Sequence, residues 1–212
     1  MSLPTPYYEH GGITIFNCDC RDILPLLEPG SVDLVLTDPP YNVGLDYCDG
    51  DSRPEYETWS KEWFRLSPQP LVFTPGMVNL AMWFRIAEPT WLCAWVKSNQ
   101  CSPSRLPGCF NTWEPILVYG RPNNNVGQDS WVCPISTSQK DVGDHPCPKY
   151  LPFWRRLLSV MSAPGQLVCD PFMGSGTTLR AAKDLGRRAI GIEIEERYCE
   201  IAVKRLQQEV LL

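Results

Sequence analysis

Short runs of branched and aromatic residues recur along the chain, and most of them end in a polar or acidic residue. Runs of this kind, bounded by Gly, Pro or Asp, are typical of β-strands. The predicted strands cover residues 13–16, 31–37, 71–74, 91–96, 115–119, 166–169 and 189–193. The sequence therefore predicts a seven-stranded sheet.

Between these strands, apolar residues recur at the i, i+3, i+4 and i+7 spacing that places them on one face of a helix. The predicted helices cover residues 77–84, 154–161, 179–185 and 198–206. Strands that alternate with helices favour a doubly wound α/β fold, in which a mostly parallel sheet carries helices on both faces. Residues 43–57 and 120–144 show little periodicity and are predicted to be long loops.

The composition is that of an ordinary globular protein. With 212 residues, of which 43% are hydrophobic and 20% charged, the whole chain 1–212 is predicted to form one domain. No run of 18 apolar residues is present, so we expect no membrane span. Residues 1–9 lack the basic start and apolar centre of a signal peptide, so we expect a cytoplasmic protein. A net charge of -5 leaves nucleic-acid binding open, because one face can still be basic.

Ten cysteines invite a metal or disulfide interpretation, but their spacing argues against both. No C-x-x-C pair occurs, and two histidines are few for a zinc site. Cys93 and Cys169 lie in predicted strands and Cys199 in a predicted helix, where a thiol acts as a small hydrophobe. We therefore predict reduced, structural cysteines and no metal.

The segment Asp170-Pro171-Phe172-Met173-Gly174-Ser175-Gly176-Thr177-Thr178 directly follows a predicted strand. Its glycines allow a tight turn and a close approach to a ligand, and its threonines begin a helix. The next strand ends at Glu193, and an acid there can accept hydrogen bonds from ribose hydroxyls. The full G-x-G-x-x-G pattern and a P-loop lysine are missing, which favours a nucleoside-type cofactor. A purely structural turn explains the glycines equally well.

A second segment, Asp38-Pro39-Pro40-Tyr41, follows the strand 31–37. The prolines fix the backbone and remove two N–H donors, leaving carbonyl oxygens as acceptors. The Asp38 carboxylate and the Pro39 carbonyl can then both accept from one planar NH₂ group and localise its lone pair. Tyr41 offers a flat surface on which a base can stack. The segment therefore indicates chemistry on an aromatic amine.

The two segments and their order resemble the beta class of DNA amino-methyltransferases, in which D-P-P-Y precedes the F-x-G-x-G cofactor motif. The resemblance covers nearly the whole chain. It implies a Rossmann-like, circularly permuted fold, S-adenosyl-L-methionine (SAM) as cofactor, and double-stranded DNA as substrate. It also implies that the target base flips out of the duplex and receives the methyl group by direct in-line transfer, without a metal.

The resemblance carries over residue by residue. It makes Asp38, Pro39, Pro40 and Tyr41 the catalytic motif. The cofactor residues that it implies are Asp19 at the adenine, Lys149 of an H-P-x-x-K segment (145–149) at the methionine pocket, Asp170, Pro171, Phe172, Gly174, Gly176 and Thr177 in the cofactor motif, and Glu193 at the ribose. Tyr198 falls where the family has a helix aromatic.

The chain departs from the family in its short region for target recognition, which is reduced to about residues 98–145. Weak specificity, a short site, or recognition completed by a second subunit all stay open, as does a cognate restriction enzyme. An acid at Asp38 is more usual for adenine-N6 than for cytosine-N4 methylation, so adenine is favoured. Cys147 follows a proline, as in cytosine-C5 methyltransferases, but D-P-P-Y makes that mechanism redundant.

Two alternatives belong to other classes. Protein glutamine methyltransferases use a similar motif, but with Asn in place of Asp and with the cofactor motif first. A catalytically silent nucleic-acid-binding module would keep only the fold. The intact residues Asp38, Tyr41, Gly174 and Glu193 argue against such decay.

Overall fold

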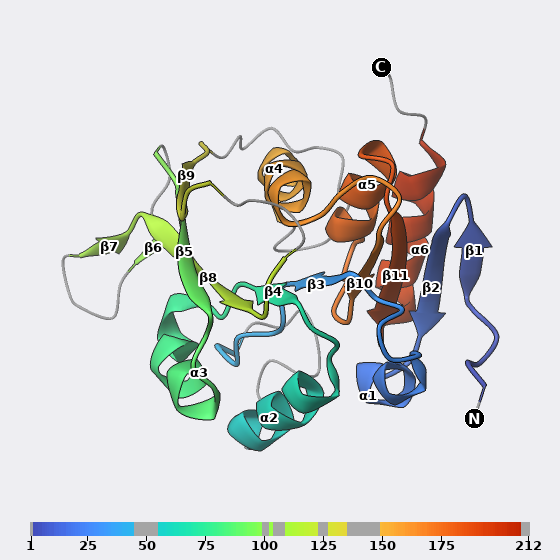
Figure 1. Cartoon of the computed structure of the whole chain (residues 1–212), viewed down its shortest axis with the longest axis horizontal. Helices are drawn as coiled ribbons and strands as arrows, with labels where there is room; N and C mark the ends of the chain where they lie inside the picture. Colours follow the sequence, from blue (N-terminus) through green and yellow to red (C-terminus); the bar gives the residue numbers. More distant parts are fainter. Residues whose placement is uncertain are drawn as a thin grey trace.

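The computed structural model describes residues 2–44, 55–98, 102–103, 109–122, 127–134 and 149–208. Its centre is a nine-stranded sheet with the order β1-β2-β11-β10-β3-β4-β8-β5-β9 (Figure 1). The strands are β1 (Tyr8–His10), β2 (Ile13–Asn17), β3 (Leu34–Thr37), β4 (Leu71–Phe73), β5 (Trp91–Val96), β8 (Trp113–Tyr119), β9 (Ser130–Val132), β10 (Leu167–Asp170) and β11 (Arg188–Glu193). A separate pair is formed by β6 (Ser102–Pro103) and β7 (Phe110–Asn111).

The predicted mostly parallel sheet is confirmed. Strands β2, β11, β10, β3 and β4 run parallel to one another, while β1 and β8 are antiparallel to their neighbours and β9 is parallel to β5. All seven predicted strands are present, but the prediction of seven is two short of the sheet. Strand β1 is short and mostly exposed, and β9 lies inside the predicted loop 120–144. The prediction of a loop is therefore wrong at residues 130–132.

Helices cover both faces of the sheet. On one face lie α4 (Leu151–Met161), α5 (Thr177–Asp184) and α6 (Glu196–Gln207), and on the other α1 (Cys20–Ile23), α2 (Tyr56–Leu66) and α3 (Leu80–Ile86) (Figure 1). Short 3-10 turns, η1 (Leu24–Leu26) and η2 (Met77–Asn79), extend α1 and precede α3. The helix predicted from residue 77 thus begins as a 3-10 turn.

Helix α2 was not predicted. The expected loop 43–57 is wrong at residues 56–57, which begin this helix, while residues 45–54 lie outside the described residues. Its buried side chains Tyr56, Trp59 and Trp63 stand at positions i, i+3 and i+7, a helical period that the acidic residues before it obscure.

Two hydrophobic cores separate the sheet from its helices. The core under α4, α5 and α6 contains Phe153, Trp154 and Leu157, each at most 1% exposed. The core under α1, α2 and α3 is rich in aromatic rings around Trp63. The Trp63 ring lies 5.5 Å from Phe73, 5.3 Å from Trp83 and 5.1 Å from Phe172, measured between centroids. Such contacts lock α2 to the sheet and to the loop after β10.

The sheet order places a topological switch between β3 and β10. These strands are parallel neighbours, yet the chain continues from β3 through α2 to β4 on one side, and from β10 through α5 to β11 on the other. In doubly wound sheets, ligands bind beyond the carboxyl ends of the strands at such a point. The two sequence motifs follow these two strand ends.

Within the described parts of the chain, no helix is long and apolar enough to span a membrane, and no group of three His, Cys, Asp or Glu could hold a metal. Cys93, Cys169 and Cys199 are buried thiols in β5, β10 and α6. Their predicted elements are confirmed.

Candidate functional site

A hydrogen bond joins the two motifs. The hydroxyl of Thr37, the last residue of β3, donates to Asp170 Oδ1 over 2.6 Å, and both residues are buried. Asp38 directly follows Thr37. Asp38 and Asp170, which are 132 positions apart in the sequence, therefore lie side by side at one edge of the sheet.

The backbone of the Asp38–Tyr41 segment is held from outside. The Tyr56 hydroxyl of α2 donates to the Pro40 carbonyl over 2.7 Å, and Asn79 Nδ2 donates to the Tyr41 carbonyl over 2.7 Å. Among the described residues, no donor contacts the Pro39 carbonyl. The described part of the protein therefore supplies no partner to the carbonyl that was predicted to accept from an amine.

The Asp38 carboxylate is the centre of a polar network. Its Oδ1 atom accepts from the Tyr41 hydroxyl over 2.5 Å, from the Thr74 hydroxyl, and from Lys149 Nζ over 3.0 Å. No donor from the described residues reaches Oδ2 of the same group. One carboxylate oxygen is therefore fixed by the protein, and the other has the capacity to accept a substrate amine.

Tyr41 stays a neutral donor in this network. Burial, together with the negative charge of Asp38, holds the pKa of its phenol well above the ordinary value. Its ring lies against Gly76, where a Cβ atom would come within 2.9 Å of the ring, and the Gly76 φ of +67° also favours glycine. The ring is thus positioned by the backbone as well as by its hydroxyl.

Lys149 belongs to the Asp38 side of the site. Besides Asp38, its ammonium contacts the Tyr41 hydroxyl at 2.9 Å and Glu114 Oε2 at 3.2 Å, and it lies 5.2 Å from the Tyr41 ring centroid. Burial opposes its charge, but Asp38 and Glu114 outweigh this effect and hold its pKa well above the ordinary value. The preceding residues 145–148 lie outside the described residues. The predicted contact of Lys149 with the methionine pocket stays a prediction.

Glu114 is a site residue that sequence reasoning missed. It lies in β8, and it also forms an ion pair with Lys97 of the segment after β5. Burial raises its pKa, but the two lysines outweigh this and lower it below the ordinary value. The available signal was an acid within the otherwise apolar run 113–119.

The loop after β10 is organised by Asp170. The carboxylate is 3% exposed, and its Oδ1 accepts from the Phe172 backbone N–H over 3.1 Å as well as from Thr37. Burial raises the pKa of this carboxyl to about 6. Pro171 is buried, and the Phe172 ring packs 5.4 Å from Trp59 of α2. Asp170 therefore shapes the turn that the glycines follow.

Glu193 ends β11 and faces this loop. Its Oε2 accepts from the Gly174 N–H over 3.0 Å, and its Oε1 from the Glu195 N–H over 2.8 Å. Burial raises the pKa of the carboxyl to about 7. Each oxygen retains a second lone pair, so the carboxylate can still accept from two hydroxyls.

Different structural constraints explain the two glycines of the loop, Gly174 and Gly176. Gly176 has a φ of +78°, and a Cβ atom there would lie 2.8 Å from the Ala202 Cβ of α6. Close packing of the turn before α5 on α6 therefore explains Gly176. Gly174 has a φ of +50°, and its N–H contacts Glu193. Thr177 begins α5, as predicted, and is buried beside Arg205 Nη1 at 3.3 Å.

Asp19 lies at the same edge of the sheet. It follows β2, whose last residue Asn17 pairs with Glu193 of β11. The Asp19 side chain accepts from the Arg21 backbone N–H and forms an ion pair of 2.7 Å with the Arg21 guanidinium. It therefore caps α1. Tyr198, in the first turn of α6, is buried in the helix packing.

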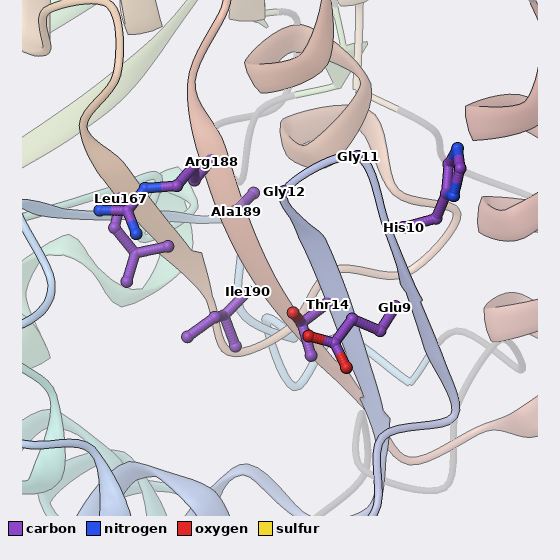
Figure 2. A pocket seen from close by; sticks show the side chains of 9 residues that line it. All are labelled: Glu9, His10, Gly11, Gly12, Thr14, Leu167, Arg188, Ala189 and Ile190. Carbon is purple, nitrogen blue, oxygen red and sulfur yellow. The ribbon is translucent and has the colours of Figure 1, made fainter.

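A hollow also lies at the opposite end of the strands. Figure 2 shows its lining, which comes from the β1–β2 hairpin and the starts of β10 and β11: Glu9, His10, Gly11, Gly12, Thr14, Leu167, Arg188, Ala189 and Ile190. Arg188 contacts the Gly165 carbonyl at 3.4 Å. No predicted site residue lies here.

Known proteins resemble this chain over most of its length. The profile of a family described as DNA methylase, covering N6 and N4 methyltransferases, matches residues 111–204. The type II methyltransferase M.HpaI of Haemophilus parainfluenzae is 30% identical, over 86% of this chain and 70% of its own length. The chain belongs to the N6/N4 DNA methyltransferase family.

The type II methyltransferase M2.DpnII of Streptococcus pneumoniae is 27% identical, over 98% of this chain and 94% of its own length.

The fold agrees with this membership. The crystal structure of the M1.HpyAVI–SAM complex superposes with a TM-score of 0.70 at 26% identity, and covers 92% of this chain and all of M1.HpyAVI. SAM is the cofactor of the N6/N4 DNA methyltransferase family, to which this chain belongs. The residues at the carboxyl edge of the sheet fit such a nucleoside, because the Glu193 carboxylate and the Gly174 turn offer the acceptors and the close backbone approach that it needs.

Proposed function

We propose that this N6/N4 DNA methyltransferase methylates N6 of adenine in double-stranded DNA, with the permuted motif order of the beta class. The single observation that carries the proposal is the geometry of the Asp38 segment. Three protein donors fix Asp38 Oδ1, whereas neither Asp38 Oδ2 nor the Pro39 carbonyl has a donor among the described residues. This pair of acceptors suits one planar NH₂ group.

In the proposed mechanism, Asp38 and the Pro39 carbonyl accept hydrogen bonds from the two N–H groups of the amine and draw its nitrogen toward tetrahedral geometry. The lone pair then points at the methyl group instead of entering the ring. Tyr41 stacks on the flipped base, a contact worth about 1–3 kcal/mol, and Pro40 holds the loop through its contact with Tyr56. Most of the rate enhancement would come from this alignment.

The cofactor half is proposed to lie over the ends of β10, β11 and β2. Glu193 would accept the ribose hydroxyls, Asp19 would contact the adenine, and Phe172 and Gly174 would line the nucleoside. Asp170, Pro171, Gly176 and Thr177 would hold the loop in shape, and Lys149 would line the methionine side. When bound, SAM supplies a methyl group activated by its sulfonium.

Adenine is proposed over cytosine because position 38 is an acid. In the resembling family, Asp at this position accompanies adenine-N6 methylation, and Ser accompanies cytosine-N4 methylation. The chain is proposed to work as one domain, with target recognition in about residues 98–145. The short recognition region favours a short target site or a second copy of the chain, and a cognate restriction enzyme stays a candidate partner.

Asp38→Ala tests the catalytic assignment. The variant should lose methylation of DNA by at least about a hundredfold, because the amine loses its carboxylate acceptor, while SAM affinity falls by no more than about tenfold. Incorporation of labelled methyl groups and calorimetry with SAM measure the two effects. Glu57→Gln is the control, since Glu57 is an exposed glutamate whose ion pairs are with Lys61 and Arg85 and not with a site residue. A near wild-type methylation rate in Asp38→Ala would remove Asp38 from the mechanism.

The base is tested separately. Expression in a host without DNA methylation, followed by mapping of modified bases across the genome, should give N6-methyladenine in a short sequence context. N4-methylcytosine would overturn the choice of adenine but not the mechanism. SAM binding without any DNA modification would instead favour a catalytically silent module, and methylation of protein glutamine would favour the other rival.

A further inference from the structure

The strongest unassigned feature is a group of four charged side chains beside the amine site. Asp38, Glu114, Lys97 and Lys149 form a connected chain of ion pairs, in which Lys149 contacts both carboxylates and Glu114 contacts both lysines. The side chains of Lys97 and Lys149 are 15% exposed, Glu114 is 21% exposed and Asp38 25%. Two carboxylates and two ammonium groups give the group a net charge of zero.

The net charge of this group matters because a positive charge moves from sulfur to the amine nitrogen during methyl transfer. The amine nitrogen forms a bond to the methyl carbon as the carbon–sulfur bond breaks, and that electron pair stays on sulfur. Nitrogen thereby takes over the positive charge, and then releases a proton to solvent. A second positive charge near the amine opposes this shift, and in a partly buried site the opposition is stronger than in water.

Lys149 supplies such a positive charge. Its ammonium lies 3.0 Å from Asp38 Oδ1 and 5.2 Å from the centroid of the Tyr41 ring, the surface proposed for base stacking. It orients the carboxylate, but it also cancels the negative charge that would favour a cationic amine. The Glu114 carboxylate, whose Oε2 lies 3.2 Å from Lys149 Nζ, offsets the positive charge of Lys149.

We propose that Glu114 is a charge-balancing residue of the methyl transfer, which offsets Lys149 so that the amine site tolerates positive charge. The proposal rests on the function proposed above, because it requires the sulfonium and the amine to meet beside Asp38. Glu114 acts through Lys149 and is a positioning residue. It lies at the carboxyl edge of the sheet because it stands near the start of β8, which runs antiparallel to β4 and β5.

The affinities of two ligands of nearly the same shape measure how well the site tolerates a positive charge, and this measurement needs no catalysis. SAM carries a positive sulfonium, whereas S-adenosylhomocysteine carries a neutral thioether at the same place. Calorimetry without DNA gives both affinities for each variant. In Glu114→Gln, SAM should bind about three- to tenfold more weakly, while S-adenosylhomocysteine changes less than about twofold. A residue that only supports the fold would weaken both ligands equally.

Three further variants test the proposal without relying on Glu114→Gln alone. Lys149→Met should shift the ratio of the two affinities in the opposite direction by a similar factor, and the double variant should return close to the wild-type ratio. Glu114→Asp keeps the charge and should keep the ratio, so it and Lys149→Met carry the test if Glu114→Gln fails to fold. Glu57→Gln is the matched control, because Glu57 also contacts two cations, Lys61 and Arg85.

The outcomes separate the two proposals. If wild type methylates DNA and the affinity ratio stays constant across Glu114→Gln and Lys149→Met, Glu114 has no charge-balancing role. If wild type binds neither ligand, the proposed function itself fails. A ratio that moves in opposite directions in the two single variants supports the charge balance.

Discussion

At the scale of single residues, the site is defined by which polar atoms the protein satisfies and which it leaves for a ligand. Tyr56 and Asn79 occupy the carbonyls of Pro40 and Tyr41, while the Pro39 carbonyl has no donor among the described residues. The sequence predicted the acceptor pair of Asp38 and Pro39. It did not predict Tyr56, because a tyrosine at the start of a helix gives no local sign of a partner 16 positions away.

Tyr56→Phe isolates this support. Loss of one hydrogen bond to the partly buried Pro40 carbonyl is worth about 0.5–1.5 kcal/mol, so the methylation rate should fall about two- to tenfold. Affinity for SAM should stay within about twofold, because Tyr56 contacts the amine side. Single-turnover kinetics and calorimetry measure the two quantities. Tyr7→Phe, at an exposed tyrosine, serves as the control; an unchanged rate in Tyr56→Phe would show that the loop keeps its shape without this bond.

At the scale of elements, helix α2 joins the two halves of the site. Its residues Trp59 and Trp63 pack on Phe172 of the cofactor loop, and Tyr56 binds the loop after β3. Periodicity predicted the strands and the four helices with clean stripes, because those patterns are local. It failed for α2, where the stripe of aromatic residues follows an acidic segment.

Trp63→Ala should be strongly destabilising. The side chain is fully buried among Phe73, Trp83 and Phe172, and large-to-small changes at such sites reduce the free energy of unfolding by about 3–5 kcal/mol. Urea titration followed by circular dichroism measures the effect. Phe84→Ala, on the exposed side of α3, should change stability by less than about 1 kcal/mol. A similar loss in both variants would contradict a central role for Trp63.

At the scale of the whole molecule, the sheet gathers two acids at its carboxyl edge, the buried Asp170 and the half-buried Glu193. Burial raises the pKa of Glu193 to about 7 and that of Asp170 to about 6. A raised carboxyl pKa means that the folded state holds its proton more tightly than the unfolded state. The two carboxyl groups therefore make their full contribution to the free energy of unfolding below their unfolded pKa values near 4. This contribution is lost as the pH rises through about 7.

Glu193→Gln tests this pH dependence. The variant lacks the ionisable group, so its free energy of unfolding relative to wild type should rise between pH 4.5 and pH 8 by on the order of 3 kcal/mol. Urea titrations of the SAM-free proteins at both pH values give the difference. Affinity for SAM should fall in the same variant, because the ribose loses a charged acceptor. A difference in stability that is equal at both pH values would exclude Glu193 as the source.

The sequence by itself determined the local parts of this protein. Alternating and helical periods set the strands and most helices, and motifs at strand ends identified the Asp38 and Asp170 loops as the chemical ones. These features depend on residues close in the chain. Only the tertiary structure decided which distant residues complete the site. Glu114 comes close to this site because β8 runs antiparallel to β4, so the start of β8 lies at the edge where β4 ends, and Lys149 contacts both Glu114 and Asp38. Gly176 must be glycine because α6 packs against it. Such contacts arise from the order of strands and the packing of helices, which depend on the whole chain rather than on any short segment of it.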